Sequence, residues 1–334
     1  MVHYSLLDLS PIVEGGDATL AFKNSVDLAQ RAEALGYYRY WLAEHHNLPG
    51  IASAATAVVI GHVAAATKQM RVGAGGIMLP NHAPLMIAEQ FGTLEAMYPG
   101  RIDLALGRAP GGDQKTARAL RRYLGSNGDT FPQDLLELQS YFRAPIPHQA
   151  VRAVPGAGLS VPIYLLGSSD FSAQLAAELG LPFAFASHFA PDYLQRALDL
   201  YRRGFKPSAT LSAPYAIVGV GVYAAETDAE ARRLFTSAQL STAKMLRGDP
   251  GELPPPVDSM DGHWNPLEQA AIEHRTRYCA VGSAATIHSQ LSEFLRETAA
   301  DEMIAIAQIF AHEARLRSCE IAADVFNELI ARDS

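Results

Sequence analysis

The feature that most constrains the fold is a repeated alternation of short apolar runs with longer helical patterns. The short runs predict eight strands, over residues 4–9, 38–43, 70–79, 102–107, 163–166, 183–186, 215–223 and 302–309. The helical patterns fall at residues 17–35, 53–66, 84–98, 115–141, 171–179, 192–203, 228–246 and 283–298, with a last helix through 316–330. Strands that alternate with helices in this way form a parallel sheet covered by helices.

The turn after the first predicted strand and the number of units together favour one architecture. The turn runs from Ser10 to Gly16 and contains no G-x-G-x-x-G, which disfavours a dinucleotide-binding fold. Eight strand–helix units in 334 residues suit a (β/α)8 TIM barrel with insertions. We therefore predict an α/β protein with a single barrel domain over residues 1–334. A proline-rich stretch at about 248–263 is predicted to be a mobile insertion.

Composition excludes several classes of protein. The net charge is −8 and no basic run occurs, which disfavours nucleic-acid binding. The two cysteines, Cys279 and Cys319, form no C-x-x-C, so neither a disulfide framework nor a zinc knuckle is indicated. No apolar run reaches the roughly 18–20 residues of a membrane span, and the first residues do not resemble a secretory leader. We expect a cytoplasmic protein that does not bind membranes.

The most reactive stretch, Glu44-His45-His46, follows the second predicted strand. Active sites of such barrels lie at the carboxyl ends of the strands, so this trio is a candidate for proton transfer. It could also be a solvated loop. A metal site is a third hypothesis, but neighbours in an extended segment point to opposite sides, and a further ligand would have to come from elsewhere.

The third predicted strand contains Gly73, Gly75 and Gly76. Glycine weakens a strand and usually marks a bulge or the close approach of another group to the backbone. A flat ring lying against the backbone would explain these glycines, and so would a simple bulge.

Two further strand ends carry groups that suit an anion. Gly167, Ser168 and Ser169 precede a predicted helix, whose amides and dipole could bind a phosphate. The alternative is an ordinary serine N-cap, which Asp170 in the first turn favours because it would repel an anion. Arg108 follows the fourth strand and could bind the same phosphate, or could form a salt bridge with Asp113.

Taken together, these segments are similar to the bacterial luciferase superfamily, and most similar to its luciferase-like flavin-dependent monooxygenases. The matching segments are residues 41–46, 72–80, 88–89, 100–101, 107–108, 162–169, 178–182 and 311–318. They are distributed over nearly the whole chain, and their combined order and spacing make the match specific.

The resemblance implies an enzyme, an oxidoreductase that uses reduced FMN (FMNH2) delivered by a separate NAD(P)H:flavin reductase. It also implies molecular oxygen as co-substrate, a C4a-peroxyflavin intermediate, a small apolar organic substrate and a homodimer. His45 matches the active-site histidine of the family and Glu44 its acidic neighbour. The implied cofactor contacts, with a cis peptide between the two glycines, are Ala74, Gly75, Gly76, Arg108, Ser168, Ser169 and Ser172.

The chain departs from the luciferases proper at two positions. It has Gly107 where they carry a cysteine and Ser168 where they carry an acidic residue, which disfavours light emission and a long-chain aldehyde substrate. Three alternatives stay open. They are a deazaflavin (F420)-dependent hydride-transfer enzyme of the same fold, a metal-dependent barrel hydrolase, and a non-catalytic flavin-binding protein.

Overall fold

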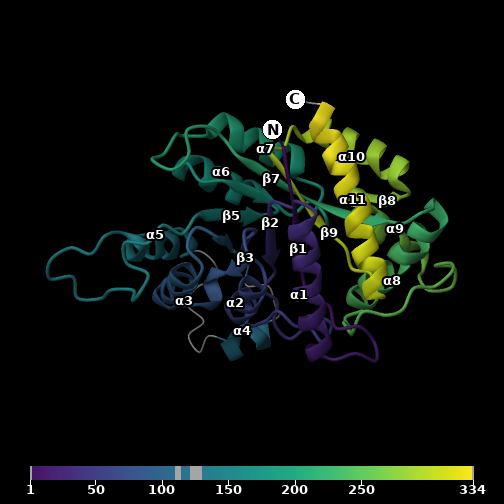
Figure 1. Cartoon of the computed structure of the whole chain (residues 1–334), viewed down its shortest axis with the longest axis horizontal. Coiled ribbons are helices and arrows are strands. Elements are labelled where there is room, and N and C mark those ends of the chain that lie inside the picture. The colour runs from purple at the N-terminus through teal and green to yellow at the C-terminus, as the bar shows by residue number, and fades with distance from the viewer. Residues whose placement is uncertain (1, 110–113, 121–129, 333–334) are drawn as a thin grey trace.

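One parallel sheet of nine strands forms the centre of the molecule (Figure 1). The computed structural model describes residues 2–109, 114–120 and 130–332. The strands are β1 (His3–Asp8), β2 (Arg39–Leu42), β3 (Arg71–Met78), β4 (Ile102–Gly107), β5 (Ile163–Gly167), β6 (Phe183–Phe185), β7 (Ala216–Ala224), β8 (Cys279–Gly282) and β9 (Glu302–Ile306).

Eight of these strands close into a barrel. The sheet order runs from β6 through β1 to β9 and β7, and β6 also pairs with β7, which closes the ring. The ninth strand, β8, pairs only with the last four residues of β7. The predicted (β/α)8 TIM barrel is therefore confirmed.

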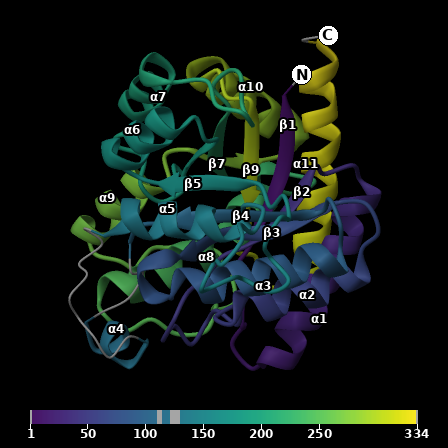
Figure 2. The ribbon, with the colours of Figure 1, turned by 90° about the vertical axis from the view of Figure 1, so that its left-hand side faces the viewer.

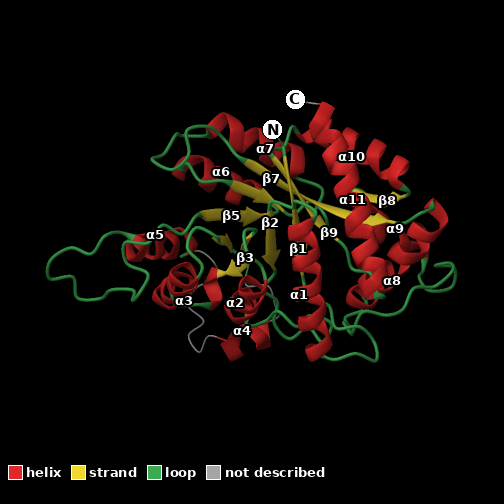
Figure 3. Cartoon of the chain, in the orientation of Figure 1, coloured by secondary structure: helices red, strands yellow, loops and turns green. Residues whose placement is uncertain are grey.

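Helices surround the barrel on its outside, as Figure 2 and the secondary-structure colouring of Figure 3 show. They are α1 (Ala18–Ala34), α2 (Thr56–Ala66), α3 (Pro84–Met97), α4 (Gln114–Leu120), α5 (Phe131–Phe142), α6 (Asp170–Leu179), α7 (Leu194–Gly204), α8 (Asp228–Leu246), α9 (Pro266–Arg275), α10 (Ala284–Thr298) and α11 (His312–Arg332), with one 3-10 turn, η1 (Leu79–Asn81).

The apolar alternation along each strand divides the core into two layers. Leu6 and Leu42 pack outward against the helices, in the large core between the barrel and its cover. Leu7 and Trp41, their neighbours in sequence, point into the barrel. This alternation fixes which strand residues can reach a site inside the barrel mouth.

Besides the short turn η1, one strand and one helix were not predicted from the sequence. Strand β8 has only four residues, too few for a period to be visible. Helix α9 begins with a capping box in which Asn265 and Glu268 bond each other's backbone amides, and this pair was a readable signal. The predicted pattern at 115–141 corresponds to α4 and α5, and its predicted break at 125–128 lies outside the described residues.

The amino ends of the strands are closed by a buried ionic network. Arg39 binds Glu302 at 2.8 Å and Asp103 at 2.7 Å, and all three side chains are inaccessible to solvent. Arg71 binds the other oxygen of Asp103 at 2.6 Å, and Tyr164 accepts a hydrogen bond from Arg39. Each charged side chain of this network thus has a partner, so no ligand is needed to satisfy it.

In the ranges that the structure describes, no helix is long and apolar enough to cross a membrane.

Candidate active site

A cavity of about 600 Å³ lies at the carboxyl ends of the barrel strands. Ligand sites typically have volumes of roughly 300–1,000 Å³. Residues from the ends of β2, β3, β4, β5 and β6 line it, together with one face of α8 and the end of α9. The predicted site residues that line it are Glu44, His45, Gly75, Gly76, Arg108, Ser168, Ser169 and Ser172. The structure therefore brings together segments that the sequence separates by more than a hundred residues.

Glu44 is the centre of a hydrogen-bonded group at one wall of the cavity. His46 and His82 each place Nε2 on its Oε1, at 2.6 Å and 2.8 Å, and the Met78 amide donates to Oε2 at 3.0 Å. Burial would raise the pKa of Glu44, but the bonds from His82 and His46 outweigh burial and lower it. An ionised carboxylate only accepts, so both imidazoles donate from Nε2.

The same three side chains are the group that best matches the metal hypothesis. The possible ligand atoms of Glu44, His46 and His82 lie within 4.8 Å of one another, and His82 is the further ligand that the sequence did not reveal. Two ligands of a tetrahedral zinc ion lie roughly 3.4 Å apart, from bonds of about 2.0–2.1 Å. The separations of 2.6 Å and 2.8 Å here are instead those of charge-assisted hydrogen bonds. The geometry therefore favours a hydrogen-bonded group that stabilises the wall of the cavity over a metal site.

His45 and His188 are two imidazoles that line the cavity. Among the described residues neither has a hydrogen-bond partner, and Nδ1 of His188 is buried. They follow β2 and β6, which are opposite strands of the ring. Burial lowers the pKa of His45, and burial with the nearby His45 lowers the pKa of His188 to about 3. Both rings are therefore neutral at physiological pH and can exchange hydrogen bonds with a ligand.

The glycine pair of β3 is explained by close packing around a bulge. The peptide between Gly75 and Gly76 is cis, as the resemblance implies. The pairing of β3 with β4 shifts register between Gly75 and Ile77, so a bulge is present. A Cβ on Gly75 would lie 2.8 Å from Trp41, and one on Gly76 would lie 2.5 Å from the Ala105 carbonyl. The pair leaves bare backbone along the cavity.

Ala74, the residue before the pair, is placed differently. It is fully buried in the core between the barrel and the helices, and it does not line the cavity. Successive residues of a strand point to opposite sides, so Ala74 faces outward because its neighbours in β3 point into the barrel.

Arg108 and three serines lie around the first turn of α6. The Arg108 guanidinium stacks 4.2 Å from the Phe171 ring centroid and has no ion-pair partner within the described ranges. Ser169 is the N-cap of α6, but its side chain makes no cap bond. Within the described residues the hydroxyls of Ser168 and Ser172 have no partner either. Within the described part of the chain, one cation, three hydroxyls and a helix N-terminus thus lack an ion-pair or side-chain hydrogen-bond partner and can bind an anion.

The carboxylate that argued against an anion is engaged elsewhere. Asp170 pairs with Arg196 of α7 at 2.8 Å. This pairing involves Oδ2 alone, and Oδ1 is buried without a partner among the described residues, so the repulsion expected from the sequence is offset only in part. The other predicted partner, Asp113 with Arg108, lies outside the described residues.

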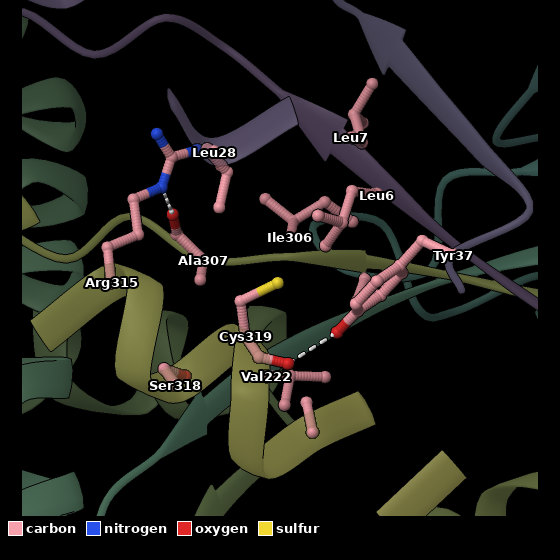
Figure 4. Close-up of a pocket in the computed structure, with 12 residues that line it drawn as sticks. Leu6, Leu7, Leu28, Tyr37, Val222, Ile306, Ala307, Arg315, Ser318 and Cys319 are labelled. Atoms are coloured by element: carbon pink, nitrogen blue, oxygen red, sulfur yellow. Dashed lines mark hydrogen bonds between the residues drawn. The ribbon is translucent and has the colours of Figure 1, made fainter. Parts of the chain in front are cut away.

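A second, much smaller cavity lies between β1, β9 and α11 (Figure 4). Its volume is about 20 Å³, room for one water molecule. The two hydrogen bonds at its edge join Tyr37 to the Cys319 carbonyl and Arg315 to the Ala307 carbonyl. It is a packing defect of the outer core and not a ligand site.

Among the residues that sequence reasoning missed at the site are two histidines and one arginine. His82 follows η1, His188 follows β6, and Arg275 ends α9. The position of His188 after an apolar strand was a signal of the same kind as that of Glu44 to His46. His82 and Arg275 gave no such signal, because a turn and an unpredicted helix bring them to the site.

Fold and site together define a (β/α)8-barrel protein with a ligand cavity at the carboxyl ends of its strands. The family described as Luciferase-like monooxygenase matches residues 3–302. The chain belongs to this family. A luciferase-like monooxygenase of Escherichia coli (strain K12) is 56% identical over 329 residues, which is 98% of each chain. Membership confirms the predicted family and the prediction that the chain is an oxidoreductase.

Solved structures agree on the fold. Apo-MsnO8 is similar with a TM-score of 0.91 and 35% identity, over 98% of this chain and 99% of that one. At 18% identity and a TM-score of 0.72, the oxygenating constituent of 3,6-diketocamphane monooxygenase, solved with FMN, covers 96% of each chain. An F420-dependent secondary alcohol dehydrogenase has 14% identity and a TM-score of 0.71, over 98% of this chain and 99% of that one. The last two comparisons concern the fold alone.

Proposed function

We propose that this protein is the oxygenating component of a two-component, FMNH2-dependent monooxygenase. A separate NAD(P)H:flavin reductase supplies the reduced flavin, and molecular oxygen and a small organic molecule are the substrates. Bound reduced FMN supplies the electrons that activate oxygen. The observation that carries the proposal is the free anion site formed by Arg108 and the serines of α6, at the edge of a cavity large enough for a flavin.

Arg108, Ser168, Ser169 and Ser172 would hold the phosphate of FMN. The cation and the α6 N-terminus both favour a doubly charged phosphate, and the serine hydroxyls can donate to its oxygens. The backbone of Gly75 and Gly76, which lines the cavity, would lie beside the flat ring. Ala74 would support this backbone from behind and not contact the ring.

His45 would lie beside the flavin ring, at the place where the reaction occurs, and would hold or move a proton there. Its imidazole lines the cavity, is neutral, and has a free nitrogen to offer a ligand. Glu44 would be a positioning residue, because its bonds to His46 and His82 fix the end of β2 relative to the turn after β3. Of the three residues, His45 would thus take part in the reaction, while Glu44 and His46 would hold the end of β2 in place.

The segment at 248–263 would act as a mobile lid over this cavity. Pro250, Gly251 and Leu253 line the cavity. Backbone hydrogen bonds join Leu253 to Ile12 and Glu14 in the turn after β1. Closing the segment would shield the reacting flavin from water.

The second candidate is a deazaflavin-dependent hydride transfer, which the fold likeness to an F420-dependent dehydrogenase keeps open. Mixing the protein with photoreduced FMN and oxygen separates the two. We expect oxygen uptake and a transient flavin absorbance with a lifetime that free FMN does not show. Binding and turnover of F420 without any effect on reduced FMN would overturn the proposal.

His45→Ala tests the role of the imidazole. We expect the affinity for FMN to stay near that of the wild type, because the phosphate is bound elsewhere. The lifetime of the transient flavin absorbance, or turnover once a substrate is known, should fall. An equal lifetime and equal turnover in the variant and the wild type would show that His45 only lines the cavity and takes no part in the reaction.

A further inference from the structure

We propose that Arg275 binds a carboxylate of the substrate, so that the substrate is an apolar molecule with one anionic group. This inference rests on the proposed function, because it names the substrate class of the same cavity. It changes the expectation of a purely apolar substrate.

The charges that line the cavity are unbalanced. Among its described lining residues only Glu44, Arg108 and Arg275 carry a full charge, and Glu44 is held by two imidazoles. Arg275 has no ion-pair or hydrogen-bond partner among the described residues. Its neighbours are engaged instead, since His274 bonds Asp192 and Arg277 donates to the Pro191 carbonyl. A guanidinium that faces a cavity without a counter-ion suits a bidentate carboxylate.

The two cations lie at different parts of the cavity. Arg108 follows β4, whereas Arg275 precedes β8, which extends the sheet beside β7. Strands β4 and β7 are three places apart in the eight-membered ring. Figure 1 shows the same separation, with α6 on one side of the barrel and α8 and α9 on the other. A flavin phosphate at Arg108 therefore leaves Arg275 available for a second ligand.

An apolar surface connects Arg275 with the two histidines. Helix α8 turns Phe235, Ala238, Thr242 and Met245 to the cavity, at spacings of 3, 4 and 3, one helical face. Phe189, beside His188, adds another ring on the same cavity wall. Met245 and Phe189 are 46% and 47% exposed, large for such side chains, so a ligand would cover apolar surface here.

His188 supplies a second, independent sign of a ligand. Its Nδ1 is buried without a partner among the described residues and faces Gly219, where an added Cβ would lie 2.4 Å away. The ring as a whole is only part-buried and lines the cavity, so its opposite edge, with Nε2, is the side that a ligand can reach. A polar atom of the substrate, between its carboxylate and the site of oxygenation, would meet Nε2 of the neutral imidazole.

Calorimetric titration with octanoate and with octanamide, its uncharged analogue, tests the assignment. Both are titrated into wild type, Arg275→Gln, Arg275→Lys and the control Arg277→Gln, each with and without FMN. We expect octanoate to bind the wild type and the Arg277 variant at least about tenfold more tightly than octanamide, the size of a charge-assisted hydrogen bond. The preference should vanish in Arg275→Gln and survive in part in Arg275→Lys.

Three results would overturn the assignment. They are no binding of octanoate, equal affinity of the wild type for both probes, and a preference that survives in Arg275→Gln but is lost in Arg108→Gln. Failure of the proposed function gives a different result: FMN does not bind, while the preference for octanoate without FMN still depends on Arg275. Thermal unfolding of each variant confirms that the fold is intact.

Discussion

The two ends of the barrel hold their charged and polar groups in opposite ways. At the amino ends of the strands, Arg39 pairs with both Asp103 and Glu302, and neighbouring polar side chains complete the two carboxylates. At the carboxyl ends, Arg108, Arg275 and the His188 Nδ1 have no partner among the described residues. The two arginines are only part-buried, so they lie in the cavity without a protein partner and can bind an anionic ligand. The difference locates function at one end and stability at the other.

We expect the largest loss of stability from a substitution in the buried ionic network at the amino ends of the strands. Arg39→Met removes the shared partner of two buried carboxylates, which typically costs about 3–5 kcal/mol. Urea unfolding followed by circular dichroism measures the change. The same substitution at Arg108 is the matched control, and its unfolding free energy should stay within about 0.5 kcal/mol of the wild type. Equal losses at the two positions would remove the distinction between the ends.

The same Arg108→Met variant should show its loss in binding. We expect the affinity for FMN to fall by about 1.5–3 kcal/mol, the contribution of a hydrogen bond to a charged group. Quenching of flavin fluorescence measures it. Methionine keeps the apolar contact with Phe171, so unchanged affinity would show that the guanidinium does not contact the phosphate.

Of the two arginines in these predictions, the sequence indicated Arg108 as a functional residue but gave no such signal for Arg39. The strand–helix alternation was sufficient to predict the barrel, and its strand ends indicated His45, Arg108 and the α6 serines. Arg39 and Glu302 gave no functional signal, because a charged residue at the start of a strand has no visible partner in a linear sequence. Partners such as His82 and Arg275 depend on turns and on short elements whose positions follow only from tertiary packing.

Acid should destabilise the open end through His188. The folded-state pKa is lowered to about 3 by burial, whereas an unfolded histidine titrates near 6.5. Between these values the unfolded state binds the extra proton, so stability falls as the pH falls. The slope for one histidine is about 1.4 kcal/mol per pH unit. Urea unfolding across this window should show a shallower slope for His188→Asn, and an unchanged slope would count against a neutral buried ring.

The smallest change in stability is expected from two helix N-cap residues, one that makes no cap hydrogen bond and one that does. The side chain of Ser169 makes no cap bond, so Ser169→Ala should cost less than about 0.5 kcal/mol of stability. Thr227 caps α8 by accepting from the Glu230 amide, and Thr227→Ala should cost about 1 kcal/mol. Only the Ser169 variant should weaken FMN binding. Thermal unfolding and flavin titration of the pair give both quantities, and the reverse pattern would assign Ser169 to structure.

We propose that the cavity binds FMN through its phosphate, at Arg108 and the first turn of α6. Parallel titrations of the wild type with FMN and with riboflavin, which lacks the phosphate, test this binding mode. We expect FMN to bind at least about tenfold more tightly, by the contribution of a charge-assisted hydrogen bond, and Arg108→Met to remove most of the difference. Equal affinities of the wild type for FMN and riboflavin would contradict it.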